Sequence, residues 1–289
     1  MIKKQVLGTA QFGINNYGVS NFSEKKTYNE LYSTFNLAFE KGVKYFDTAP
    51  EYKSEKILGR FIKSNKIQKE IKVITKVPSL DKNNKDFFSQ IKKSIEQSLE
   101  DLNIDQIFCL LMHDQQDIIK IQNDKNLFLE IKKKYNIKNI GFSVYDINIS
   151  KKVLKSFPNA SLQFPFNPLN NKFISLKKNK KNLFFGRSIF CQGFLTNQRI
   201  KKLKKKLILS HKKYFKFIQD AKIDPVKLCL DYAYSNKSLN FIVYGVRNID
   251  ELKKVIEYKP KKILNNTMIN KIKFFFKNND VDPRTWCSR

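Results

Sequence analysis

The chain has few residues of the kinds that bind metals or form disulfides. Its two histidines, His113 and His211, have no cysteine or carboxylate partner at a metal-ligand spacing such as H-E-x-x-H. Its cysteines are isolated, without a C-x-x-C pair: Cys109, Cys191, Cys229 and Cys287. We therefore expect reduced thiols and no disulfide, and the composition argues against a zinc enzyme.

Long apolar segments are absent as well. No run of about 18 uncharged apolar residues occurs, which is what a membrane-spanning helix would need. The first residues, MIKKQV, carry charges and no apolar stretch long enough for a signal peptide. These features predict a soluble, cytoplasmic protein with no membrane partner.

Acidic residues are scarce compared with basic ones, at 26 against 56, which gives a formal net charge of +30. Such an excess raises the possibility of nucleic-acid binding. However, only six of the 56 basic residues are arginine, the side chain that phosphate and base recognition usually employs. The lysine-rich runs 177–181 and 201–206 contain no aromatic residues on which bases could stack. We therefore predict solvated surfaces and no nucleic-acid partner, and keep nucleic-acid binding as an alternative.

The pattern along the chain is typical of alternating strands and helices. The 289 residues, 41% of them hydrophobic and 25 of them Phe, suffice for one large core, and no linker divides them. Eight short β-branched or aromatic runs are predicted strands: 5–9, 44–47, 72–76, 106–112, 139–143, 161–164, 183–188 and 241–244. Amphipathic stretches between them are predicted helices: 24–41 behind a Ser23 cap, 54–64, 86–102, 126–135, 148–156, 224–235 and 249–257.

This alternation favours a single-domain α/β fold over residues 1–289, a (β/α)8 TIM barrel. A doubly wound sheet is the alternative, but no G-x-G-x-x-G follows the first strand. The pattern is weakest at 170–182, where a polar segment replaces a clear sixth helix, and at 198–223, a long basic insertion. An extra helix is expected at 265–278, within a C-terminal extension of about 265–289.

Polar side chains at the ends of predicted strands are candidates for chemistry, because barrel active sites gather at the carboxyl ends of the strands. Asp47, Lys76 and His113 end the second, third and fourth strands, and Tyr52 follows Asp47 in the next loop. Each could be structural by itself: a helix cap, a solvated lysine, a core histidine, a packed ring. Together they form a device for delivering a proton to a carbonyl oxygen, since an ammonium held by a carboxylate stabilises the anion that a phenol leaves behind.

At these residues the sequence resembles the aldo-keto reductases. The resemblance rests on motifs from residue 5 to about 257: LGTAQFG (7–13), GVKYFDTAPEY (42–52), SE (54–55), LG (58–59), ITKVP (74–78), SLEDLNID (98–105), LLMH (110–113), GFSV (141–144), QFPFN (163–167) and QG (192–193). It implies an NAD(P)H-dependent carbonyl reductase on a TIM barrel. It also implies that Tyr52 is the general acid, that Lys76 lowers its pKa, that Asp47 pairs with Lys76 and that His113 orients the substrate.

The resemblance also suggests the residues that bind the nucleotide. They are Ser143 and Gln163 for the carboxamide, Arg187 against the nicotinamide, the turn of Gln192 and Gly193, and, for the phosphates, Gly245, Val246, Arg247 and Asn248. The sequence departs from the family pattern at Val144, where Asn is common, and at Arg187, where an aromatic often stacks. Lys53 replaces the usual Gly after the tyrosine.

The choice between the two nucleotides is open at this point. Glu251 stands where relatives that prefer NADP often carry Arg, and a carboxylate would repel a 2′-phosphate. Arg247, Lys253 and Lys254 favour NADP. We expect NADP as the cofactor, with NAD as the alternative.

The sequence therefore predicts a cytoplasmic oxidoreductase that reduces an aldehyde or ketone of small size. A nicotinamide-nucleotide-binding regulatory protein on the same barrel, with little or no turnover, is the alternative. The substrate's identity and the oligomeric state have no signature in the sequence.

Overall fold

The structure is a computed structural model that describes residues 4–14, 26–84, 86–124, 126–198, 200, 205–261, 264–277 and 282. Eight parallel strands form a closed barrel in which each strand pairs with its neighbours in sequence order. The strands are β1 (Lys4–Gly8), β2 (Tyr45–Asp47), β3 (Lys72–Val77), β4 (Ile107–Met112), β5 (Ile137–Ser143), β6 (Ser161–Pro165), β7 (Phe184–Arg187) and β8 (Phe241–Gly245). Because β1 also pairs with β8, the predicted barrel is confirmed and the doubly wound alternative is wrong.

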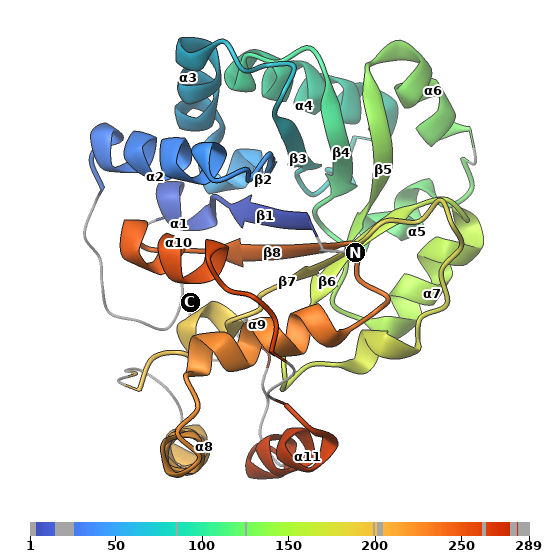
Figure 1. Cartoon of the computed structure of the whole chain (residues 1–289). Helices are drawn as coiled ribbons and strands as arrows, with labels where there is room; N and C mark the ends of the chain where they lie inside the picture. Colours follow the sequence, from blue (N-terminus) through green and yellow to red (C-terminus); the bar gives the residue numbers. More distant parts are fainter. Residues whose placement is uncertain are drawn as a thin grey trace.

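Helices surround the barrel on its outer side (Figure 1). They are α1 (Ala10–Gly13), α2 (Tyr28–Glu40), α3 (Glu55–Asn65), α4 (Phe87–Leu102), α5 (Asp117–Ile121), α6 (Leu127–Lys134), α7 (Ile147–Ser156), α8 (Lys205–Asp220), α9 (Pro225–Ser235), α10 (Ile249–Ile256) and α11 (Asn266–Phe275). Short 3-10 turns follow three of the strands: η1 (Pro50–Tyr52), η2 (Lys172–Ser175) and η3 (Cys191–Gly193). Over the described residues, no helix combines the length and the apolar character needed to cross a membrane.

Two separate apolar cores hold the barrel. The larger lies between the strands and the helices, and the smaller fills the barrel interior. Within the smaller core, the rings of Tyr45, Phe108 and Phe241 pack against one another with centroids 5.0 to 5.6 Å apart. These residues stand at or next to the first positions of their strands, so their rings close the amino end of the barrel. The open end is therefore the carboxyl end.

Close contact between strands explains one glycine of the sequence. A Cβ atom at Gly141 in β5 would lie 1.8 Å from the Ser161 carbonyl oxygen of β6. Only glycine allows these two strands to approach in this register.

The second helix begins later than the sequence predicts. Thr27 is its N-cap: the hydroxyl accepts the backbone N–H of Glu30 at 3.3 Å, and the Glu30 carboxylate accepts the Thr27 N–H at 2.7 Å. This reciprocal capping satisfies two otherwise unpaired backbone donors and sets the helix start at Tyr28. The predicted start at Glu24 behind Ser23 lies outside the described residues.

The basic stretch described as an insertion contains a helix that the sequence analysis did not predict. It is α8, which lies beside α11 at the lower edge of the barrel in Figure 1. Helix α11 occupies the stretch for which an extra helix is expected. The short α5 was likewise not predicted, and the 170–182 segment contains only the 3-10 turn η2.

Candidate active site

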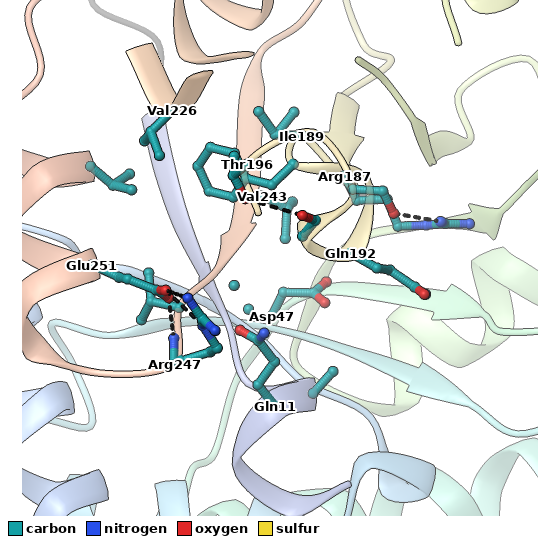
Figure 2. Close-up of a pocket in the computed structure, with 18 of the residues that line it drawn as sticks. Gln11, Asp47, Arg187, Ile189, Gln192, Thr196, Val226, Val243, Arg247 and Glu251 are labelled. Atoms are coloured by element: carbon teal, nitrogen blue, oxygen red, sulfur yellow. Dashed lines mark hydrogen bonds and ion pairs between the residues drawn. The ribbon is translucent and has the colours of Figure 1, made fainter. Parts of the chain in front are cut away.

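A pocket opens at the carboxyl end of the barrel, where residues at the ends of β2, β7 and β8 line it (Figure 2). It extends from Asp47 and Tyr52 to Glu251 and Lys254 on α10. Between these ends it is lined by residues at or after the ends of β1, β7 and β8, among them Gln11, Arg187, Gln192, Gly193, Gly245, Val246 and Arg247. The pocket is therefore an elongated groove with one end over the barrel axis.

Asp47 and Lys76 form a buried ion pair beneath this pocket. Asp47 ends β2 and Lys76 lies near the end of β3, where the two side chains are 4% and 0% exposed. The Lys76 ammonium donates to Asp47 Oδ1 and to the Thr48 carbonyl oxygen, each at 2.8 Å. Gln163 from β6 donates its Nε2–H to Asp47 Oδ2 at 2.5 Å. The three polar side chains thus hold one another in fixed positions.

Tyr52 lies directly beside this pair. The Lys76 Nζ atom is 4.7 Å from the centroid of the Tyr52 ring. The backbone of the tyrosine packs against Gly13, where a Cβ atom would lie 1.9 Å from the Tyr52 carbonyl oxygen. Burial is the main cause that raises the pKa of Tyr52, and Asp47 raises it further, whereas the Arg187 guanidinium lowers it. The phenol therefore remains protonated over the neutral pH range.

His113 follows β4 and contacts the tyrosine edge to face, with ring centroids 5.6 Å apart. Its Nδ1 atom lies 2.5 Å from Oε2 of Glu51. The hydrogen bond from His113 is the main cause that lowers the pKa of Glu51. Sequence reasoning missed Glu51 as a partner. A carboxylate directly before Tyr52 was visible in the sequence, but its contact with a histidine 62 positions later, His113, was not.

The predicted carboxamide-binding residues, Ser143 and Gln163, do not line the groove themselves but contact Arg187 and Asp47, which do. Ser143 and Gln163 are 2% and 0% exposed, and Gln163 Oε1 has no hydrogen-bond partner among the described residues. Arg187 ends β7, and its guanidinium carbon lies 4.0 Å from the centroid of the Tyr145 ring. After Arg187 the chain turns sharply, since Ser188, Cys191 and Gln192 have φ values of 49 to 55°. Non-glycine residues in this left-handed region are uncommon and cluster at functional sites.

The predicted phosphate turn makes different contacts from those expected. The Arg247 backbone N–H donates to Glu251 Oε2 at 2.7 Å, and Arg247 Nε donates to Oε1 at 2.7 Å. Asn248 does not line the pocket and caps α10 by accepting the Glu251 N–H at 2.9 Å. Gly245 and Val246 do line it. At this end of the groove, Glu251 therefore accepts from Arg247 donors that the sequence analysis assigned to the phosphates of the nucleotide.

Among the residues that the structure describes, no group of three or more histidine, cysteine or acidic side chains could hold a metal ion. Three cysteines lie buried as free thiols: Cys109, Cys191 and Cys229. Burial raises the pKa of Cys109 to about 12.

The fold and this site define a (β/α)8 barrel protein whose polar residues converge at the carboxyl ends of its strands. The profile of the aldo/keto reductase family matches residues 5–275, and the chain belongs to that family. It is accordingly an oxidoreductase.

Comparisons with individual proteins show further similarities. The chain is 24% identical over 245 residues to L-galactose dehydrogenase of Arabidopsis thaliana, which covers 76% of this chain and 75% of the relative. The glycerol dehydrogenase AKR11B4 from Gluconobacter oxydans has a similar structure, with a TM-score of 0.70 at 17% identity over 96% of this chain and 92% of that one. The holo form of the aldo-keto reductase AKR11C1 from Bacillus halodurans has a TM-score of 0.71 at 17% identity, over 95% and 92% of the two chains. At such identities the structural likeness concerns the fold.

Proposed function

We propose that this protein reduces the carbonyl group of a small aldehyde or ketone with a reduced nicotinamide nucleotide, and that Tyr52 donates the proton. The observation that carries the proposal is the buried Lys76 ammonium, held by Asp47 and lying 4.7 Å from the Tyr52 ring. An ammonium fixed in this position stabilises the phenolate that remains when Tyr52 gives up its proton.

The described residues suit a bound nicotinamide nucleotide. Gln163 Oε1 is a buried acceptor without a partner among them, and a carboxamide N–H would satisfy it. The groove continues from this region past Gly245, where a Cβ atom would lie 2.7 Å from Gln11 Oε1. Family members use NAD(P)H. Bound in the groove, the reduced nicotinamide would supply a hydride to the carbonyl carbon.

The chain's own residues would supply the remaining chemistry. Tyr52 is protonated at neutral pH because burial raises its pKa, so it is ready to act as an acid. Asp47 and the Thr48 carbonyl oxygen hold the Lys76 ammonium in place. Glu51 engages Nδ1 of His113, which leaves Nε2 as the imidazole nitrogen available to the carbonyl oxygen. We assign the catalytic roles to Tyr52, Lys76, Asp47 and His113 on these contacts.

NADP is our proposed nucleotide and NAD the alternative. Lys254 lines the far end of the groove, and Arg247 lies there with it. Glu251 opposes a 2′-phosphate, but its carboxylate is already engaged by Arg247. A 2′-phosphate would therefore compete with Glu251 for the same guanidinium.

Rapid mixing of the protein with NADPH or NADH and a panel of aldehydes and ketones tests the proposal, with the loss of reduced-nicotinamide absorbance as the readout. We expect oxidation of the nucleotide with at least one carbonyl compound and none without it. Tight nucleotide binding with no oxidation by any member of the panel would contradict the proposal. That result would support the regulatory, nucleotide-binding alternative.

A further inference from the structure

Arg187 lies at the barrel end of the groove with no acidic partner within ion-pair distance among the described residues. Its contacts are neutral: the Tyr145 ring at 4.0 Å, the Ser188 hydroxyl at 3.4 Å and the Ser143 hydroxyl at 3.5 Å. The two hydroxyl contacts are long for hydrogen bonds, so they satisfy the guanidinium weakly. A half-buried guanidinium with five N–H donors thus retains unused donor capacity.

Other side chains beside Tyr52 already have partners within the protein. The Lys76 ammonium contacts Asp47 at 2.8 Å, and His113 Nδ1 contacts Glu51. Arg187 lines the pocket at this end, and no carboxylate of the described residues lies within ion-pair distance of it. A single guanidinium fits a monoanion better than it fits a phosphate ester, which carries nearly two negative charges at neutral pH.

The Arg187 side chain lies away from the end of the groove that would hold the 2′-phosphate of the nucleotide. Figure 2 shows Arg187 and the Arg247–Glu251 pair on opposite sides of the pocket. Arg187 and Tyr52 line the same pocket, and the guanidinium lowers the pKa of that phenol. If Arg187 bound the anionic group of a substrate, the substrate's carbon atoms next to that group would therefore lie in the same pocket as Tyr52.

We infer that Arg187 binds a carboxylate on the substrate, so that the substrate class is a small oxo acid bearing an aldehyde or ketone. The planar guanidinium fork matches a carboxylate through two parallel N–H···O bonds. In the reaction the carbonyl π bond breaks, the carbon gains the hydride and the oxygen gains the Tyr52 proton. The carbonyl is reduced to a hydroxy acid while the nicotinamide is oxidised. This inference rests on the proposed function for its reaction, but not for the binding of the anion.

A matched pair of substrates tests the inference: 4-oxobutanoate, which carries a carboxylate, and its methyl ester, which does not. We expect the wild-type protein to prefer the acid in kcat/KM by about 10- to 100-fold, the value of a charged hydrogen-bonded contact. Arg187→Gln is expected to remove this preference by raising KM for the acid more than KM for the ester, whereas any loss through the nucleotide or Tyr52 would be common to both substrates. Equal losses for both substrates would overturn the inference, because they would indicate that Arg187 packs on the nicotinamide instead.

Lys53→Gln is the matched control, because it removes one positive charge from an exposed side chain next to Tyr52. We expect it to leave the preference for the acid intact. If Lys53→Gln reduced the preference as much as Arg187→Gln does, the overall positive potential near Tyr52, and not binding by the Arg187 guanidinium, would explain the preference for the acid. A wild-type preference for glyceraldehyde 3-phosphate over glyceraldehyde, with none for 4-oxobutanoate, would also overturn the assignment of a carboxylate.

Calorimetric binding of succinate to the protein saturated with oxidised nucleotide tests the anion site without turnover. We expect succinate to bind the wild-type protein about tenfold or more tightly than it binds Arg187→Gln. Equal binding by both proteins, or no binding by either, would overturn the inference. A protein that binds succinate through Arg187 but oxidises no nucleotide would leave the site standing and contradict only the proposed reductase activity.

Discussion

Replacing Lys76 with Met removes one half of the buried Asp47–Lys76 pair and tests how the centre of the site is held. Lys76 is fully buried and Asp47 is 4% exposed, so the carboxylate left behind could not gain full hydration. Breaking a buried pair from one side costs about 3 to 5 kcal/mol. Gln163 would still donate to Asp47 at 2.5 Å, which places the expected loss toward the lower end of that range.

Urea titration followed by circular dichroism would measure this loss as a change in the free energy of unfolding. With an unfolding entropy of roughly 2.1 cal/mol/K per residue, the same loss lowers Tm by about 5 to 8 °C for a chain of this length. The double variant Asp47→Asn, Lys76→Met is expected to recover most of the stability, because it leaves no unpaired charge.

Lys92→Met provides the control, since it makes the same chemical change at an exposed pair whose atoms are 3.9 Å apart. We expect it to cost less than about 1 kcal/mol. A loss of that small size for Lys76→Met as well, or a double variant no more stable than the single one, would refute the account of a tightly held buried pair.

Two further substitutions test electrostatic features near the site. Burial raises the pKa of Glu55, which is 3% exposed and accepts from Thr75 at 2.6 Å. The folded protein then binds more protons than the unfolded chain between the two pKa values, so this group's contribution to stability falls as pH rises through that window. Glu55→Gln should therefore gain stability relative to wild type from pH 5 to pH 8 in urea titrations, and a constant difference would contradict this. Glu251→Gln should remove the negative charge that pairs with Arg247 and improve binding of NADP relative to NAD by about tenfold, as measured by fluorescence titration. An unchanged ratio would show that Glu251 does not oppose the 2′-phosphate.

The strands were predictable because each is a short apolar run with a clear boundary, and every predicted strand overlaps an observed one. Helix α8 was missed although its buried residues recur at helical spacing, including Leu207, His211, Tyr214 and Ile218. The many lysines in this stretch obscure the apolar periodicity in the sequence. The start of α2 was misplaced because Ser23 and Thr27 are both good caps in sequence, and only the contact with Glu30 distinguishes them.

The sequence also predicted that the residues of the candidate site lie close together. Asp47, Tyr52, Lys76 and His113 lie at neighbouring strand ends, and the contacts among them follow from the closed barrel. Burial was not predictable in the same way. Lys76 was expected to lower the pKa of Tyr52, whereas desolvation dominates and raises it. Partnerships set by side-chain direction, such as those of Glu51 with His113 and of Glu251 with Arg247, likewise required the three-dimensional structure.

Single-turnover reduction by Tyr52→Phe tests the central claim most directly. The account predicts a fall of about 10²- to 10⁴-fold in the rate of nucleotide oxidation by a carbonyl substrate, with nucleotide affinity unchanged. Tyr135→Phe, which removes a surface hydroxyl bonded to Glu96, should retain the wild-type rate. If Tyr52→Phe oxidised the nucleotide as fast as the wild-type protein does, Tyr52 would not be the proton donor and the proposed mechanism would be contradicted.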